Sequence, residues 1–470
     1  MKTLNRKETG LTELHPTKIL QFGEGNFLRA FVDWIIDQMN EKASFHGSVE
    51  IIQPIEKGMG DMINQQDGLY HVILNGIINN QPSQEIRLIK CVKKVINPFT
   101  DYESFLKTSE NPDLEFIVSN TTEAGIAFNP ADQNILNQLP SGFPGKLTQW
   151  LFHRFNYFKG NPEKGLILFP CELIDKNGTN LKKTVEQYID LWNLPVEFKR
   201  WVQEHNLFCN TLVDRIVPGF PKENIKTLQE HVGYQDNLMV TAELFHLWVI
   251  EGPGFIASKF PSQRAGLQVK FVDDLSPYRT RKVRILNGAH TAMVPVAYLK
   301  GLRWVSEAVN NPEVGRFIKE TIFEEIIPTL DLAEKELIDF ANDVITRFRN
   351  PAIQHELSSI ALNSISKFKV RVLPSLLTYA KNKGTLPPHL VTSFAALIRF
   401  YQGSWKGNPL PVQDGEDVVI FFREAWKITD QEERLNLILS HDAFWGENLT
   451  LIPDLQKAVG KALTNIEKDW

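Results

Sequence analysis

Lys18-Ile-Leu-Gln-Phe-Gly-Glu-Gly-Asn-Phe-Leu-Arg29 joins a short apolar run to a Gly-x-Gly pair and then to apolar residues at helical spacing. A strand that turns tightly into a helix is the setting in which proteins bind a dinucleotide pyrophosphate, because glycines allow close approach and the helix N-terminus attracts anions. The third glycine of G-x-G-x-x-G is missing, since Leu28 occupies its position. An ordinary strand-to-helix turn therefore remains an alternative.

This stretch contains the candidate contacts to a pyrophosphate, which are Gly23, Gly25, Asn26 and Phe27. Arg29 is a further candidate, because a guanidinium binds phosphate bidentately, although a surface salt bridge would explain it equally well. Gln53, at the tip of the next predicted strand, is a candidate for a ribose hydroxyl. It carries no charge to repel a 2′-phosphate, so the residues alone leave NAD and NADP open.

A second polar cluster, with Ser119, Asn120, Thr121 and Glu123, follows a later apolar run. In a doubly wound sheet the carboxyl ends of the strands face the cofactor, so these residues are candidates for hydrogen bonds to ribose or nicotinamide. A helix N-cap with Glu123 at its third position is the structural alternative, and both interpretations can hold together.

The first half of the chain alternates apolar runs with helical patterns, which predicts an α/β fold with a Rossmann-like, doubly wound parallel sheet. We expect two or more of the later strands to lie outside the nucleotide-binding core. The expected strands are 18–22, 49–54, 88–96, 114–119, 165–170 and 211–217, and the helices between them include 27–39, 102–108, 147–159 and 181–192.

From about residue 275 onward, helical spacing replaces the strand pattern. We therefore predict two domains: a dinucleotide-binding domain over 1–275 and a mainly α-helical substrate-binding and catalytic domain over 276–470. A chain of 470 residues is too long to fold around one ordinary hydrophobic core. Small-molecule sites commonly form between domains, so we expect the active site there.

Lys282, Asn287 and His290 fall in the pattern K-x4-N-x2-H within a mostly apolar segment. Burial lowers the pKa of a lysine, and a lysine so tuned can exchange a proton with a carbinol or carbonyl. The amide and the imidazole can polarise the same oxygen. On an α-helix Asn287 and His290 share a face, and Lys282 lies about 80° around from His290. A solvated helix face with a cap is the structural alternative.

Both motifs together resemble the polyol-type long-chain dehydrogenases, the mannitol dehydrogenase family. That family carries G-x-G-x-F-x-R near the N-terminus and K-x4-N-x2-H past the middle, in the order found here. The resemblance implies an NAD-dependent oxidoreductase with Lys282 as general acid and base. Further matching segments are 66–70, 118–123, 171–172, 177–178, 213–216 and 366–368.

Departures from the mannitol-type pattern bear on the substrate. Glu172-Leu173 replaces an Asp-Asn pair, and Ser359 stands where an arginine is expected. The local runs are similar to the branch that reduces the hexuronate tagaturonate to altronate, with fructuronate or a neutral ketose such as fructose as alternatives. The candidate substrate-binding residues are Glu172, Asp214, Lys367 and Arg371, of which Lys367 and Arg371 are cations suited to a carboxylate.

Structural roles are the alternatives to substrate binding. Asp214 could instead pair with the adjacent Arg215, and the cations at 367, 369 and 371 could instead form a solvated helix face. A non-catalytic nucleotide-binding sensor or scaffold is the rival function. Absorbance at the NADH band during incubation with keto sugar acids would separate it from an enzyme.

Composition restricts the remaining possibilities. A net charge of −5 gives no electrostatic reason to expect a nucleic acid or an anionic membrane as partner. The three cysteines are far apart, which favours a reducing compartment and argues against a structural zinc site. No histidine spacing suggests a metal site. With neither a secretory signal nor a membrane-spanning run in the sequence, we expect a cytoplasmic protein. Its oligomeric state is left open.

Overall fold

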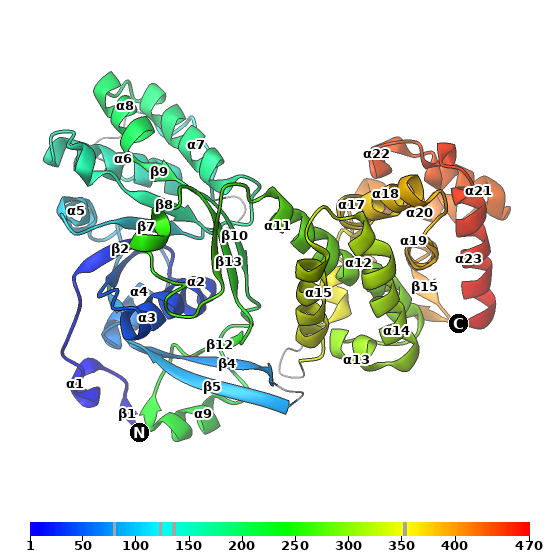
Figure 1. Cartoon of the computed structure of the whole chain (residues 1–470), viewed down its shortest axis with the longest axis horizontal. Coiled ribbons are helices and arrows are strands. Elements are labelled where there is room, and N and C mark those ends of the chain that lie inside the picture. The colour runs from blue at the N-terminus through cyan, green and yellow to red at the C-terminus, as the bar shows by residue number, and fades with distance from the viewer. Residues whose placement is uncertain (79–80, 122–124, 134–137, 351–354) are drawn as a thin grey trace. The chain divides into compact units, whose positions relative to one another are not determined.

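The computed structural model describes residues 1–78, 81–121, 125–133, 138–350 and 355–470. The chain divides into two compact units, Met1–Leu275 and Ser276–Trp470. Each unit has its own architecture, which is α/β in the first and helical in the second (Figure 1).

The first unit is built around a six-stranded, all-parallel sheet. From edge to edge its strands are β6 (Val92–Ile96), β3 (Ser48–Ile52), β2 (Thr17–Phe22), β7 (Phe116–Ser119), β8 (Ile167–Pro170) and β9 (Leu207–Phe208). The chain runs outward from β2 to β6 and then returns to β7, so the winding reverses between β2 and β7. Ligands of such sheets bind beyond the carboxyl ends of the strands at this reversal. The predicted Rossmann-like fold is confirmed.

Both faces of this sheet are buried, because side chains alternate along each strand. Ile19 packs in one core with Phe31 and Ile35, from the segment that includes α3 (Val32–Lys42). Leu20 and Phe22 pack in the opposite core, which is covered by α6 (Phe143–Tyr157), α7 (Asn177–Leu191) and α8 (Val196–His205) (Figure 1).

Three elements differ from their predicted extent. The helix expected over 27–39 is broken at Phe31, which has φ −123° and ψ −71° and separates α2 (Asn26–Ala30) from α3. The run 88–96 is divided between β5 (Gln81–Ile89) and β6, and β5 pairs with β4 (Tyr70–Ile78), which also pairs with β12 (Val240–Glu243).

The run 211–217 shortens to β10 (Asn210–Asp214), which lies outside the main sheet as expected. It joins β13 (Leu247–Glu251) and β14 (Val269–Val272) in a sheet of three strands.

In the described part of the second unit, the chain is helical apart from two short strands, β15 (Ser404–Trp405) and β16 (Asn408–Pro409). Its central helix is α12 (Gly288–Leu299), in which all twelve residues are buried. The Ser393 hydroxyl on α19 (Pro388–Phe400) donates to the Ala292 carbonyl at 2.9 Å. The other long helices are α14 (Pro312–Glu320), α15 (Glu334–Phe348), α18 (Leu373–Lys383), α20 (Glu416–Ala425), α21 (Gln431–Leu439) and α23 (Leu455–Asp469).

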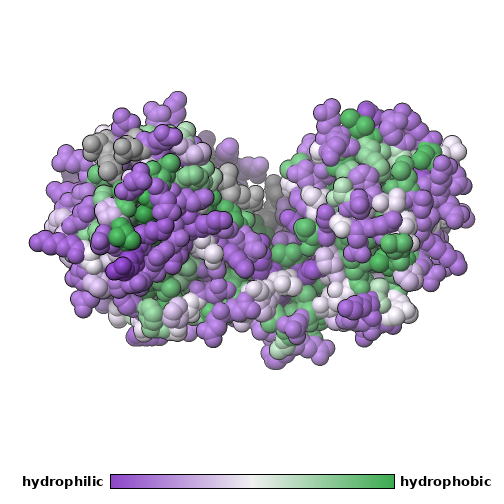
Figure 2. Space-filling view, turned by 90° about the horizontal axis from the view of Figure 1, so that it is seen from above, coloured by the Kyte–Doolittle hydropathy of each residue, from purple (hydrophilic) through white to green (hydrophobic). Residues whose placement is uncertain are grey.

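On the face shown in Figure 2, the surface of each unit is largely hydrophilic. Figure 2 shows smaller hydrophobic patches among the hydrophilic residues on the face in view. Among the residues that the structure describes, no helix is both long enough and apolar enough to cross a membrane.

Candidate active site

The Gly-x-Gly turn follows β2 directly and faces the carboxyl end of β7. Gly23 has φ +122°, a conformation that favours glycine, and a Cβ there would lie 3.0 Å from the Asn120 carbonyl. Gly25 caps α2, and a Cβ at Gly25 would meet no atom within 4 Å. The turn therefore leaves open space at the end of the sheet where a backbone-bound phosphate group would fit.

Arg29 is buried, with 1% of its surface exposed, rather than lying on the surface. Its guanidinium donates to the carbonyls of Glu24 (3.1 Å) and Leu238 (2.6 Å) and to Asn26 Oδ1 (2.7 Å). The surface salt-bridge alternative is thus wrong. The bonds to the Glu24 carbonyl, between the two glycines, and to the Asn26 side chain, at the start of α2, hold the turn in place. Arg29 is therefore a buried support of the turn.

Gln53 is also bonded within the protein. Its amide nitrogen donates to the carbonyls of Ile55 (2.8 Å) and Glu56 (2.9 Å), and its oxygen accepts from the Gly60 N–H at 3.1 Å. Gln53 therefore shapes the loop 53–60 that follows β3, in place of the open ribose contact that the sequence suggested.

Ser119 and Thr121, at the end of β7, are joined to Glu172, which follows β8. The Ser119 hydroxyl donates to Glu172 Oε2 at 3.0 Å, and the Thr121 N–H and hydroxyl donate to Oε1 at 3.1 and 3.0 Å. Burial raises the pKa of the Glu172 carboxyl. Both of its oxygens thus bind protein donors, while the Asn120 amide donates to the Cys171 carbonyl at 2.8 Å. Glu123 lies outside the described residues.

Asn177 joins the ends of two strands in different sheets, a role that sequence reasoning missed. Its amide donates to the carbonyl of Pro170 at 2.8 Å and accepts from the Thr211 N–H at 2.8 Å. Asp214 is buried at the end of β10. The neighbouring Arg215 guanidinium donates to the carbonyls of Glu243 (2.9 Å) and Ala30 (2.8 Å).

The Lys-Asn-His set begins in a π-helical turn, Lys282–Asn287, between α11 (Ser276–Arg281) and α12. A π turn has about 4.4 residues, or about 82° per residue, against about 100° in an α-helix. Lys282 is then about 10° around from His290, whereas a continuous α-helix would separate them by about 80°. Lys282 and Asn287 are both half-buried. The π turn thus brings the first and last members of the set to one face.

His290 lies in the first turn of α12 and is 8% exposed. Its Nε2 is buried and has no hydrogen-bond partner among the residues that the structure describes. The ring stacks on Phe348 with centroids 4.2 Å apart and meets the edge of His355 at 5.1 Å. Burial, followed by the nearby charges of His355, Arg347, Arg371 and Lys367, holds the pKa of His290 well below its ordinary value. This imidazole is therefore neutral and has an unused polar atom.

Lys367 and Arg371, on α17 (Ser364–Arg371), contribute to the positive field at His290. Lys367 Nζ donates to the Ile360 carbonyl at 3.0 Å. Burial, and for Lys367 also the charge of Arg371, lowers the pKa of both. Sequence reasoning missed Arg347 and His355. An arginine on the buried face of α15, beside Phe348, was the available signal.

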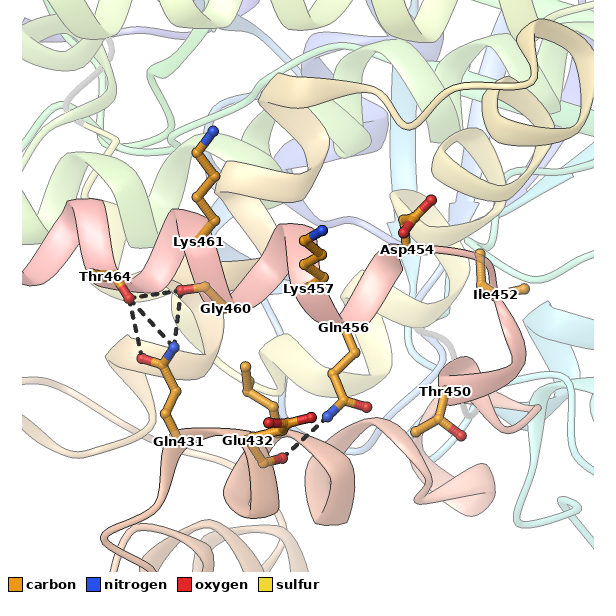
Figure 3. A pocket seen from close by; sticks show the side chains of 11 residues that line it. Gln431, Glu432, Thr450, Ile452, Asp454, Gln456, Lys457, Gly460, Lys461 and Thr464 are labelled. Carbon is orange, nitrogen blue, oxygen red and sulfur yellow. Dashed lines mark hydrogen bonds between the residues drawn. The ribbon is translucent and has the colours of Figure 1, made fainter.

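A groove of about 500 Å³ lies between α21 and α23 and holds none of the candidate residues (Figure 3). In this groove, Gln431 donates to the Gly460 carbonyl and Gln456 donates to the Glu432 carbonyl, both at 3.1 Å. The polar side chains of the groove therefore link α21 to α23. Within the described ranges, no three His, Cys, Asp or Glu side chains are grouped so as to hold a metal ion.

A Rossmann-like unit followed by a helical unit with a Lys-Asn-His set is the architecture of a two-domain dehydrogenase. The family model of the mannitol dehydrogenase Rossmann domain matches residues 17–263, and that of the mannitol dehydrogenase C-terminal domain matches residues 274–467. The chain belongs to the mannitol dehydrogenase family and is an oxidoreductase that acts on CH–OH groups.

Curated relatives match the chain over its whole length. An altronate oxidoreductase of Phocaeicola vulgatus is 48% identical and one of Bacillus subtilis 47%; the alignments cover 100% of this chain and 98% and 96% of those proteins. Among solved structures, a D-sorbitol dehydrogenase has a TM-score of 0.85 at 22% identity, covering 100% of this chain and 98% of that one. Mannitol 2-dehydrogenase from Pseudomonas fluorescens, bound to NAD and D-mannitol, has a TM-score of 0.70 at 21% identity. That match covers 100% of this chain and 97% of the mannitol 2-dehydrogenase chain.

Proposed function

We propose that the protein catalyses the reversible, NADH-dependent reduction of the keto group of D-tagaturonate to D-altronate. The names of its relatives, altronate oxidoreductases at 48% and 47% identity over the full chain, support a sugar acid as substrate. The cations around His290 support it independently, because a hexuronate carries a carboxylate that needs a positive partner.

The observation that carries this proposal is the buried, unpartnered Nε2 of His290. A buried polar atom without a partner is costly unless a ligand satisfies it. The imidazole is neutral, so it can donate a hydrogen bond to a substrate oxygen without competing as an acid. It shares a helix face with Lys282, which supplies the proton, and Asn287 contributes an amide donor nearby.

During reduction, Lys282 donates a proton to the alkoxide oxygen while Asn287 and His290 hydrogen-bond the same oxygen. NADH, when bound, supplies the hydride to the keto carbon. In the oxidative direction Lys282 accepts the proton of the carbinol. These three side chains polarise the carbonyl, so the proposed mechanism needs no metal ion.

The residues at the end of the sheet fit a dinucleotide. The space above Gly25 leaves room for a pyrophosphate, and Gly23, Asn26 and Phe27 complete that turn. Ser119, Asn120 and Thr121 are suited to the nicotinamide riboside half, at the strand beside β2. Arg29 and Gln53 would act by holding the surrounding loops.

Lys367 is the first candidate for the substrate carboxylate, and Arg371 is the second. Arg347 joins them as a third cation near His290. Glu172 is tied to Ser119 and Thr121, so we propose that it orders the site instead of binding the sugar.

Steady-state rates with NADH and three substrates, tagaturonate, fructuronate and fructose, test this function. We expect kcat/KM to be highest for tagaturonate and lowest for fructose. A preference for fructuronate would change only the hexuronate. Equal efficiency with fructose would refute the carboxylate site, and no loss of NADH absorbance with any of them would refute the reaction.

A further inference from the structure

Glu24, the residue between the two glycines, extends its carboxyl toward the loop that follows β3. It is 7% exposed, and its Oε1 accepts from the Met59 N–H at 3.4 Å. Oε2 accepts no hydrogen bond from any other residue that the structure describes. A Cβ at Gly58 would overlap Oε1 and the Gln53 amide, so the glycine allows the carboxyl to approach this closely. The carboxyl also accepts from the N–H of Glu24 itself, so two of its roughly four acceptor sites are used and the others are available to a ligand at the end of β3.

The end of β3 is where Rossmann-like domains usually place the acid that reads the adenosine ribose. Here that position is Gln53, and three hydrogen bonds within the loop 53–60 occupy its amide. Gln53 brings no negative charge and no unused polar atom. The tip of β3 thus lacks its usual acid, and Glu56 further along the loop is exposed to solvent, while a buried carboxyl from the neighbouring strand-to-helix turn lies against the same loop.

Arg29 fixes the backbone of Glu24 in this arrangement. Its Nε donates to the Glu24 carbonyl at 3.1 Å, and its buried guanidinium cannot move without losing its bonds to Leu238 and Asn26. The Arg29 side chain is therefore a positioning residue for the turn, and the direction of the Glu24 side chain is set by structure that is already buried.

We infer that the Glu24 carboxylate binds the ribose 2′-hydroxyl of the nucleotide and excludes a 2′-phosphate. A carboxylate accepts strong hydrogen bonds from a hydroxyl donor, whereas a phosphate at the same place would bring like charges together. This inference rests on the proposed nucleotide-dependent function and assigns its preference for NAD over NADP to one side chain outside β3.

Binding of ADP-ribose and of 2′-phospho-ADP-ribose, measured by calorimetry on the full chain, tests this role without the catalysed reaction. In Glu24→Gln, which keeps the shape and removes the charge, we expect the ratio of the two dissociation constants to shift toward the phosphorylated ligand by about tenfold or more. Glu56→Gln is the matched control, because Glu56 is an exposed acid of the same loop. It should leave the ratio within about twofold of the wild type.

A second variant covers the case in which Glu24→Gln does not fold. Gly58→Ala should displace the Glu24 carboxyl together with the uncharged Gln53 amide, and it should weaken ADP-ribose binding more than binding of the 2′-phosphorylated ligand because only Glu24 carries a charge. Gly254→Ala is its control, since a Cβ there meets nothing within 4 Å. An unchanged ratio in a folded Glu24 or Gly58 variant overturns the inference alone. If the wild type binds neither ligand, the proposed function fails and the inference fails with it.

Discussion

The turn after β2 and the segment that begins α12 are both polar stretches in apolar surroundings, but they use their side chains differently. At the turn, Arg29 bonds to protein carbonyls and Gln53 is bonded within its own loop. At the start of α12, His290 has a buried nitrogen that forms no hydrogen bond with any described residue. In the proposed function, the first region would bind the pyrophosphate through backbone that these side chains hold in place, with the Glu24 side chain at the ribose, and the second region would present side chains directly to the substrate.

This difference follows from what each ligand needs. A pyrophosphate is recognised by N–H groups and glycines, so the side chains around it are free to become structural supports. A carbonyl that becomes an alkoxide needs a proton donor and preorganised hydrogen-bond donors. Variants in the two regions should therefore fail in different ways, which the following measurements examine.

The largest effect is expected for Lys282→Ala. Removal of the general acid should lower kcat for tagaturonate reduction by about 10²–10⁴-fold while leaving nucleotide affinity unchanged. Steady-state kinetics and a binding isotherm measure the two quantities. Lys383→Ala, an exposed lysine at the end of α18, is the control. Turnover near that of the wild type would remove Lys282 from the mechanism.

His290→Ala should lower kcat/KM by about 10²–10³-fold, because the alkoxide loses a preorganised donor. Since burial and nearby cations keep the pKa of His290 well below its ordinary value, its imidazole is neutral near pH 7. The pH dependence of kcat/KM should therefore keep the same acid limb in the variant. An acid limb in the wild type that vanishes in His290→Ala would contradict this assignment.

Lys367→Ala should raise KM for tagaturonate by about tenfold and leave the weak activity toward fructose unchanged, because only the uronate has a carboxylate. Lys369→Ala is a matched control from the same helix, where Lys369 Nζ donates to the Ala443 carbonyl. Should both substrates respond equally to the loss of Lys367, its role would be structural.

The smallest effect concerns stability in the first unit. Asp33 is fully buried, the Tyr70 hydroxyl donates to it at 2.7 Å, and burial raises the pKa of its carboxyl to about 7. The folded state thus holds a proton that the unfolded state has released above pH 4 or so, and the free energy of unfolding falls as pH rises from about 4 to 7.

In Asp33→Asn the fall in the free energy of unfolding should be smaller by about 1 kcal/mol between pH 5 and pH 6, as measured by urea unfolding. Asp61→Asn, an exposed acid on α4 (Gly60–Gln65), should behave as the wild type does. Parallel curves for all three proteins would show that Asp33 does not carry the effect.

Sequence alone predicted the sheet of the first unit because each strand is buried on both faces and therefore reads as an apolar run. It did not predict the break at Phe31 or the separation of β5 from β6, since both depend on tertiary contacts. The strand β4 was also missed: Tyr70 bonds Asp33 and stacks near Arg29, contacts that no local pattern records.

The Lys-Asn-His set was found from its spacing, but its geometry was not. A helical wheel assumes the same rotation, about 100°, at every residue, and the π turn over Lys282–Asn287 departs from that angle. Arg347 was missed because an arginine at this position of an amphipathic helix is expected at the boundary between its apolar and polar faces, whereas the structure buries it. Internal hydrogen bonds of Arg29 and Glu172 likewise require the fold before they can be seen.

The π turn also accommodates one extra residue in this segment without rotating Lys282 away from His290. Deleting one residue between Lys282 and Asn287 would allow the helix to continue as an ordinary α-helix through α12. Lys282 would then stand seven residues before His290 on one α-helix, about 20° around from it, so the two side chains would still share a face. The π turn thus lets eight residues separate Lys282 from His290 in the sequence while the two side chains keep the facing that seven residues give in an α-helix, and a chain with one residue fewer here should keep both its core and its proton donor.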